Sequence, residues 1–418
     1  MKTEESRMRV VVTLLSVLFI SMVPVNSNPE LKLLQIVFAH KTFAPILDLI
    51  NSNEMDVPRR LTYEYFNTAP LTMPNINKLN MHKLGAHLRD AYDEFLGDIY
   101  THETMKMQTA GYTLSMISGQ LVNSGLWPPA ESQKWNTDIN NWQPIPTEYL
   151  PMQKDTLFLG IHCPSFALEM EKMLRMNTVR EKLSHYAPLF DHISSHTGMK
   201  IQQPSEVALL YAVLETKADL NQSLPQWAQD IFPDGGMYNV SLLEYDLLCE
   251  TSLQKQLNGG TILKEILANS LMYIKGSIPK ERKLMVYSGN ERNIVGVLKA
   301  LNLWSPHIPN EAASVIFELY FDNKTGDHGM KINYYTGVDG DTIPLKIPNC
   351  TEICPMNTFL RSVFDVLPQN AELLCNWKKI DWSDNNVILS NSIYSRSSSS
   401  TLDSIIFTLL LVITLFVH

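Results

Sequence analysis

The stretch "LKLLQIVFAHKTFAP", residues 31–45, decides the fold class. Its segment "LLQIV" is a continuous apolar run of strand length, which predicts a buried strand of a parallel sheet. His40 follows at the end of this strand, a favourable place for chemistry in α/β folds. Its neighbours Ala39, Lys41 and Phe43 are unusual residues to flank a catalytic nucleophile. The sequence therefore raises the question of whether His40 acts as one.

Further patterns extend this strand into an α/β fold. Apolar residues at helical spacing predict a helix within 82–100. The segment 107–127 is also predicted to be helical and to stop at two prolines. Strands are expected at 283–289, 314–322 and 330–337, and a helix at 291–304. Residues 166–260 are rich in helical patterns, so we expect an α/β core interrupted by a helical insertion.

Both ends of the chain resemble processing signals. Basic residues, an apolar run and small residues predict a secretory signal peptide at 1–27, with an uncleaved anchor helix as the alternative. At the other end, a serine-rich linker at 386–404 precedes an apolar tail at 405–418. This order predicts a GPI-anchor signal, and a short tail-anchor helix is the alternative. We therefore expect membrane attachment through the tail and an extracellular or cell-surface location, with lysosomes a less favoured destination.

Composition supports the secretory route. The formal net charge is −9 and no basic block is present, which argues against a nucleic-acid partner. Five cysteines remain for an oxidising compartment, so one of them lacks an intrachain partner. Four asparagines lie in glycosylation sequons: Asn221, Asn239, Asn323 and Asn349.

Six segments, taken together, resemble one family. "QIVFAHKTFAP", "WQPIPTEYLP", "ISSHTGMKI", "LNGGTILKEIL", "KLMVYSGNERNIVGVLKAL" and "PNCTEICP" occur in the same order as in the histidine acid phosphatases, and the chain is most similar to the insect venom and lysosomal types. The resemblance covers about 31–380. It implies a phosphoglycerate-mutase-like, three-layer α/β/α histidine phosphatase core at 28–165 and 262–385, with the helical insertion at 166–261.

The resemblance also implies a chemistry. In this family the histidine of an Arg-His-Gly-x-Arg-x-Pro motif attacks a phosphomonoester and becomes phosphorylated. Two arginines of the motif and a third from a later segment clamp the phosphoryl oxygens, and a later His-Asp pair supplies another donor and the general acid. Arginine suits this task because its planar fork makes two parallel hydrogen bonds to one phosphate.

This chain departs from the motif at almost every clamp position. His40 matches the nucleophile, whereas Ala39, Phe43 and Gln108 stand where the three arginines are expected. Asn290 replaces the later histidine, and Glu291 replaces the aspartate as proton donor. Loss of a single oxyanion-type donor costs about 10²–10³ in rate. Three losses should leave little activity, although Lys41 or Arg292 could restore some positive charge.

The resemblance implies two disulfides, Cys163–Cys375 and Cys350–Cys354, which leaves Cys249 free. His192 and His196 have the i, i+4 spacing of zinc ligands, but no third ligand accompanies them and the segment recurs in the family. We therefore expect no metal and no other cofactor. Family members are often dimers, so a homodimer is possible, and the sequence names no ligand.

Two functions compete at this point. The first is a pseudophosphatase, a binding or interaction protein on the histidine acid phosphatase fold. The second is an active acid phosphatase that forms a phosphohistidine at His40, with Glu291 as proton donor and substitute cations. A third, less favoured, is a structural or venom component whose site has no task.

Overall fold

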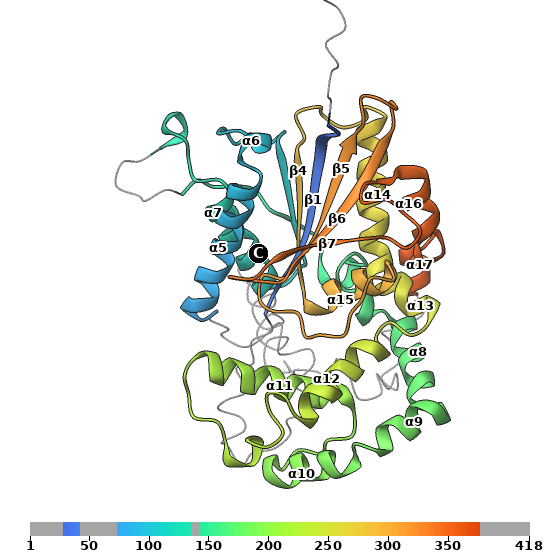
Figure 1. Ribbon diagram of the computed structural model, residues 1–418. Coiled ribbons are helices and arrows are strands. Elements are labelled where there is room, and N and C mark those ends of the chain that lie inside the picture. Colours follow the sequence, from blue (N-terminus) through green and yellow to red (C-terminus); the bar gives the residue numbers. More distant parts are fainter. Residues whose placement is uncertain (1–27, 42–72, 136–141, 377–418) are drawn as a thin grey trace, which may run out of the picture.

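The computed structural model describes residues 28–41, 73–135 and 142–376 (Figure 1). Within these residues the strands form one sheet in the order β3-β2-β4-β1-β5-β6-β7, with β8 beside β6. The strands are β1 (Glu30–His40), β2 (Met105–Thr109), β3 (Glu148–Tyr149), β4 (Leu284–Asn290), β5 (Ser314–Phe321), β6 (His328–Tyr335), β7 (Thr342–Leu345) and β8 (Cys354–Pro355).

Strand β1 lies in the middle of the sheet. It runs parallel to β4, as predicted, with His40 level with Asn290. On its other side it runs antiparallel to β5, so the sheet is mixed rather than purely parallel. The strands expected at 314–322 and 330–337 form the antiparallel pair β5–β6. The carboxyl ends of β1 and β4 therefore meet at one edge of the sheet.

The two faces of β1 explain its continuous apolar run. Leu33 and Val37 belong to a core that contains side chains of α14 (Thr261–Ile274), α15 (Glu291–Ala300) and α16 (Met356–Val363). Leu34 and Ile36 belong to a second core that contains side chains of α5 (Asn75–Ala91) and α7 (Thr113–Leu126). The polar residue of the run, Gln35, donates to the Ile266 carbonyl and to Ser270 Oγ, both at 2.9 Å. A strand with helices on both faces must be apolar on both, and this arrangement confirms the three-layer α/β fold class.

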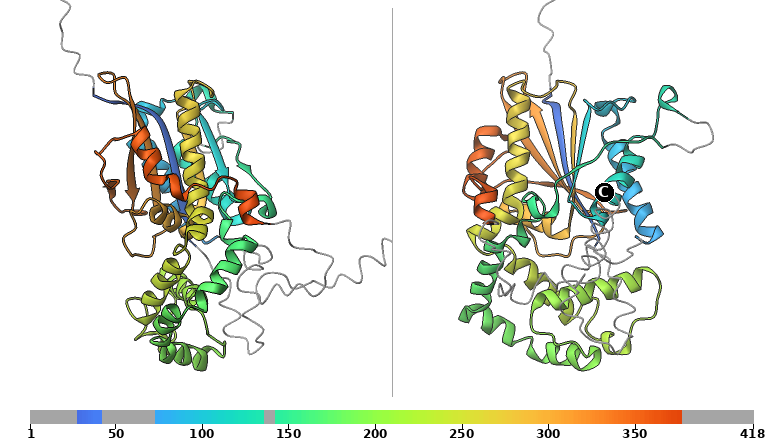
Figure 2. Two further views of the ribbon diagram at one scale, coloured as in Figure 1. Left: turned by 90° about the vertical axis from the view of Figure 1, so that its right-hand side faces the viewer. Right: turned by 180° about the vertical axis from the view of Figure 1, so that it is seen from behind.

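Helices cover both faces of the sheet and also form a separate group below it (Figures 1 and 2). The core helices are α5 (Asn75–Ala91), α6 (Asp93–Leu96), α7 (Thr113–Leu126), α14 (Thr261–Ile274), α15 (Glu291–Ala300), α16 (Met356–Val363) and α17 (Ala371–Cys375). The helices between β3 and α14 are α8 (Pro164–Leu174), α9 (Asn177–Ser184), α10 (Ala187–Thr197), α11 (Pro204–Asp219), α12 (Gly236–Leu247) and α13 (Ser252–Lys255).

We call α8 to α13 the helical insertion. It has an apolar core of its own, built on α10, α11 and α12. An insertion of helices between strands is the predicted arrangement, whereas the division of the chain at 166 and 261 stays a prediction.

One helix prediction is wrong at its beginning. The segment 107–127 was expected to be helical throughout, but β2 extends to Thr109 and α7 begins only at Thr113. The short strand alternates buried and part-buried side chains, a period of two that the helical pattern of the following residues obscures. Gln108 consequently lies on a strand.

The glycine pair at 259–260 has a packing role. Gly259 has a φ of +105°, and a Cβ there would lie 2.2 Å from the Gly296 carbonyl oxygen of α15. Only glycine allows this approach, so the turn serves the contact between two helices.

Several predictions lie outside the described residues: the signal peptide, Phe43, the serine-rich linker and the apolar tail. Among the helices that the structure describes, none combines the length and apolar character needed to cross a bilayer.

Candidate active site

The candidate site lies where β1 and β4 end side by side. His40 is the last residue of β1 and its side chain is fully buried. Asn290, the last residue of β4, is its neighbour in the parallel register. Asn290 also forms the N-cap of α15, so Glu291 and Arg292 follow in the first turn of that helix. The ends of β1 and β4 thus bring His40 and Glu291, the expected nucleophile and proton donor, to the same edge of the sheet.

Both ring nitrogens of His40 are engaged. Nδ1 lies 3.0 Å from the Lys41 carbonyl oxygen, and Nε2 lies 2.9 Å from the Tyr112 hydroxyl. Burial lowers the pKa of His40, which favours the neutral ring at neutral pH. A carbonyl oxygen can only accept, which places the proton on Nδ1 and leaves the Nε2 lone pair to accept from the Tyr112 hydroxyl. The nitrogen that would attack a phosphoryl group therefore already has a partner.

Tyr112 also contacts Asn290, at the end of β4. Asn290 Nδ2 lies 3.4 Å from the Tyr112 hydroxyl oxygen. Burial raises the pKa of Tyr112 far above its usual value, so the hydroxyl keeps its proton. Asn290 Oδ1 accepts from the backbone N–H groups of Arg292 and Asn293, at 3.0 and 3.3 Å. The amide thus caps a helix and contacts Tyr112.

Carboxylates of the helical insertion contact Lys41, and the charge of another acts on Arg292. Lys41 Nζ lies 2.5 Å from Asp219 Oδ2 and 3.3 Å from Glu215 Oε2, both on α11. Burial acts to lower the pKa of Arg292, but the charges of Glu291 and Glu244 outweigh it and hold the pKa above its usual value. Glu244 lies on α12.

The chain matches a known family. The model of the histidine phosphatase superfamily (branch 2) matches residues 75–335, more than half of the chain. The chain belongs to the histidine phosphatase superfamily. It is 34% identical over 376 residues to venom acid phosphatase Acph-1 of Apis mellifera, covering 89% of this chain and 95% of that protein. It is 27% identical over 357 residues to human prostatic acid phosphatase, covering 83% and 88% respectively.

A solved structure supports the fold assignment. The phytase of Hafnia alvei in complex with myo-inositol hexakis sulphate aligns with a TM-score of 0.61 at 15% identity, over 84% of this chain and 99% of that one. At this identity the likeness concerns the fold.

Two of the positions expected to clamp phosphate, Ala39 and Gln108, lie among the described residues. Ala39 is buried in the apolar core. Gln108 lies on β2, in register with Tyr287 of β4, which in turn pairs with Val37 of β1. Gln108 is thus two strands from β1 and three residues below the level of His40. Tyr112, which sequence reasoning did not single out, reaches His40 instead.

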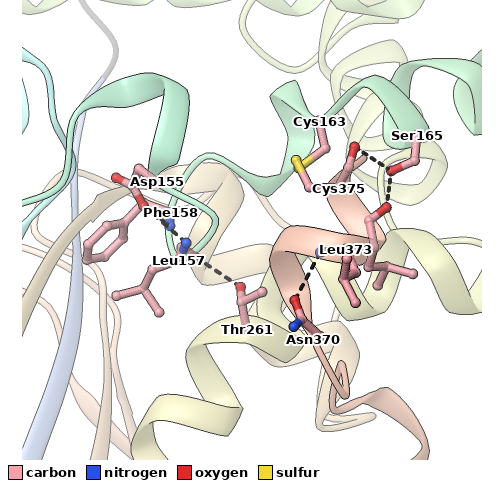
Figure 3. The surroundings of a disulfide bond; sticks show 10 residues. Asp155, Leu157, Phe158, Cys163, Ser165, Thr261, Asn370, Leu373 and Cys375 are labelled. Atoms are coloured by element: carbon pink, nitrogen blue, oxygen red, sulfur yellow. Dashed lines mark hydrogen bonds between the residues drawn. A yellow bond between two sulfur atoms is a disulfide. The ribbon is translucent and has the colours of Figure 1, made fainter. Parts of the chain in front are cut away.

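Two further titratable groups lie near this site without having been predicted. His162 is held neutral because burial and the charge of Arg292 lower its pKa to about 4. Asp155 is 1% exposed, and burial raises its pKa to about 6. Its Oδ1 accepts from the backbone N–H groups of Leu157 and Phe158, at 3.1 and 3.0 Å (Figure 3). No pattern in the sequence marked either residue.

Asp155 makes stability depend on pH. An unfolded aspartate titrates near 3.9, so the folded protein holds this proton more tightly. The stability that protonation contributes is full below about pH 4 and is lost as the pH rises through 6.

From pH 4 to pH 7.5, the free energy of unfolding of Asp155→Asn should rise relative to the native protein by roughly 3 kcal/mol. Urea titrations at several pH values measure this. The exposed Asp230→Asn serves as control, and parallel pH curves for Asp155→Asn and the native protein would contradict the assignment.

The disulfide predictions are confirmed. Cys163 is bonded to Cys375, and Cys350 to Cys354. Next to the first bond, Ser165 Oγ donates to the Leu374 carbonyl at 2.6 Å, which ties the start of α8 to α17 (Figure 3). Cys249 is free and buried, and burial raises its pKa to about 12. It therefore behaves as a small apolar residue.

The remaining candidates have structural surroundings. His192 Nε2 lies 3.0 Å from the Trp227 carbonyl oxygen, and His196 Nδ1 lies 2.9 Å from the His192 carbonyl oxygen. Across the described part of the chain, no group of three or more histidine, cysteine or carboxylate side chains is arranged to hold a metal ion. All four sequon asparagines are exposed: Asn221, Asn239, Asn323 and Asn349.

Proposed function

We propose that this chain is a histidine-acid-phosphatase-like protein that has lost efficient phosphomonoester hydrolysis and serves a binding or interaction role. The contact between Tyr112 and His40 carries this proposal. In-line attack requires the Nε2 lone pair to face the phosphorus atom. That lone pair accepts the Tyr112 hydroxyl at 2.9 Å, so the hydroxyl occupies the position that a phosphoryl group would need.

The charges around His40 support the same function. Phosphoryl transfer depends on positioning and on neutralising the equatorial oxygens. Ala39 and Gln108 supply no charge, and Lys41 lies against two carboxylates. Arg292 is balanced by Glu291 and Glu244. A phosphate dianion would have to displace these internal partners.

An active acid phosphatase is the second candidate, and the relatives favour it. Venom acid phosphatase Acph-1 and prostatic acid phosphatase are named for this activity, and the likeness spans most of the chain. In this candidate function His40 forms the phosphohistidine, Glu291 donates the proton, and Lys41 and Arg292 neutralise charge. Tyr112 must then swing away from His40 before the substrate binds.

We also infer that the protein follows the secretory pathway. Relatives named for venom and lysosomes, two disulfides and exposed sequons support this inference. The signal peptide at 1–27 and the GPI anchor from Ile405 belong to the same proposal. Release of the protein from expressing cells by phosphatidylinositol-specific phospholipase C would test the anchor. Retention on the membrane with the tail peptide present would contradict it.

Trapping of the intermediate separates the two functions. The protein is mixed with p-nitrophenyl phosphate at acid pH and quenched in alkali, in which phosphohistidine survives. Peptides containing His40 are then analysed by mass spectrometry, with the honeybee venom enzyme as positive control and His40→Ala as negative control. We expect no phosphopeptide from the native protein. A phosphorylated His40 in a substantial fraction of molecules would establish the active enzyme instead.

A further inference from the structure

The helical insertion places two carboxylates directly against Lys41, a cation that a phosphate beside His40 would use. Lys41 follows His40 at the end of β1, and its ammonium group lies against Asp219 and Glu215 of α11 at 2.5 and 3.3 Å. The Lys41 side chain is 14% exposed, whereas Glu215 and Asp219 are 29% and 43% exposed, so solvent screens the two pairs in part. The ammonium group thus already has two anionic partners.

The second cation differs from the first. Arg292 lies in the first turn of α15, and the charge of Glu244 of α12 acts on it. Burial has the largest effect on Glu244 and raises its pKa, although the charge of Arg292 opposes this. Direct contact between a cation of the α/β core and carboxylates of the helical insertion is therefore seen at Lys41.

The helix α11 packs on α12 through a shared apolar core, which holds Glu215 and Asp219 in place. Glu291 adds a third carboxylate, whose charge acts on His40 and on Glu215. Bringing like charges together in a partly buried site is costly, so a dianion that approaches Lys41 is repelled by these carboxylates.

We propose that Glu215 and Asp219 are specificity-determining residues, internal counter-ions of Lys41 through which the helical insertion excludes tetrahedral anions such as phosphate from the site beside His40. This inference rests on the proposed function. It adds a second reason, besides the Tyr112 contact, for the loss of phosphomonoester hydrolysis. The site as built accepts uncharged or positively charged groups more readily than a phosphomonoester.

The test measures sulfate binding, because sulfate is a tetrahedral dianion whose charge stays constant across the working pH range. The variant Glu215→Gln/Asp219→Asn is compared with the native protein by calorimetric titration at low ionic strength. We expect at least about tenfold tighter binding to the variant, with the gain shrinking as salt is added. The control Glu181→Gln/Asp230→Asn makes the same substitutions at exposed positions of the helical insertion and should bind sulfate like the native protein.

Circular dichroism melting establishes that each variant is folded. If the double variant is unfolded, Asp219→Asn carries the test with Asp230→Asn as its control, since Asp219 is the more exposed of the two carboxylates. A folded variant that binds sulfate no tighter than the control would overturn the inference. Turnover by the native protein tests the proposed function separately, because it does not depend on the ratio of sulfate affinities between variants.

Discussion

At acid pH, the purified protein should hydrolyse p-nitrophenyl phosphate at no more than about 10⁻³ of the rate of a relative that keeps the arginine clamp. Each missing donor costs about 10²–10³ in rate, and donors that act together are not additive. The relative rate of about 10⁻³ is therefore an upper limit, because it corresponds to little more than the loss of one donor. Steady-state release of p-nitrophenol, with the honeybee venom enzyme assayed in parallel, provides the measurement.

The variant His40→Ala distinguishes residual catalysis from contamination. If His40 no longer attacks phosphorus, the small rate of the native protein and that of the variant should be equal. A native rate within tenfold of the venom enzyme, abolished by His40→Ala, would show that Tyr112 moves aside and that Lys41 and Arg292 replace the arginines. The pseudophosphatase proposal would then be wrong.

Removal of the Cys163–Cys375 disulfide should lower the free energy of unfolding by about 2–5 kcal/mol. The bond joins residues 212 positions apart, and a cross-link of this span strongly restricts the unfolded chain. Both cysteines are fully buried, so Cys163→Ala/Cys375→Ala leaves no polar group unpaired. Urea unfolding under non-reducing conditions measures the loss.

The second disulfide is the matched control. Cys350 and Cys354 are separated by 4 positions, so Cys350→Ala/Cys354→Ala should cost less, about 2 kcal/mol from loop closure. Equal losses for the two pairs would mean that local packing, rather than the length of the loop, determines the stabilisation.

Most of the fold could be predicted because its signals are local. The apolar runs of β1 and β4 and the helix after β4 follow directly from their residue patterns. The beginning of α7 was missed because β2 is only five residues long and its alternation merges with the helical pattern that follows. The antiparallel pairing of β1 with β5 is decided by tertiary packing. A run that is apolar on both faces does not indicate the direction of the neighbouring strands.

The candidate site was predictable only in part. The motif positions His40, Asn290 and Glu291 could be located because an ordered set of segments matches the family. Tyr112 could not, since it reaches His40 only because β2 and β1 flank β4. Glu215 and Asp219 lie more than 170 residues from Lys41 in the chain, and their contact depends on how the helical insertion docks.

The central position of β1 has a consequence for biosynthesis. His40 pairs with Asn290, so the ribosome must add 250 residues before the first strand of the sheet meets its parallel neighbour. At about 5–20 residues per second, this delay lasts roughly 12–50 s. Throughout that time an apolar segment emerges without its neighbour and is open to aggregation. Nascent chains of this protein should therefore depend on holding chaperones until β4 and β5 have left the ribosome.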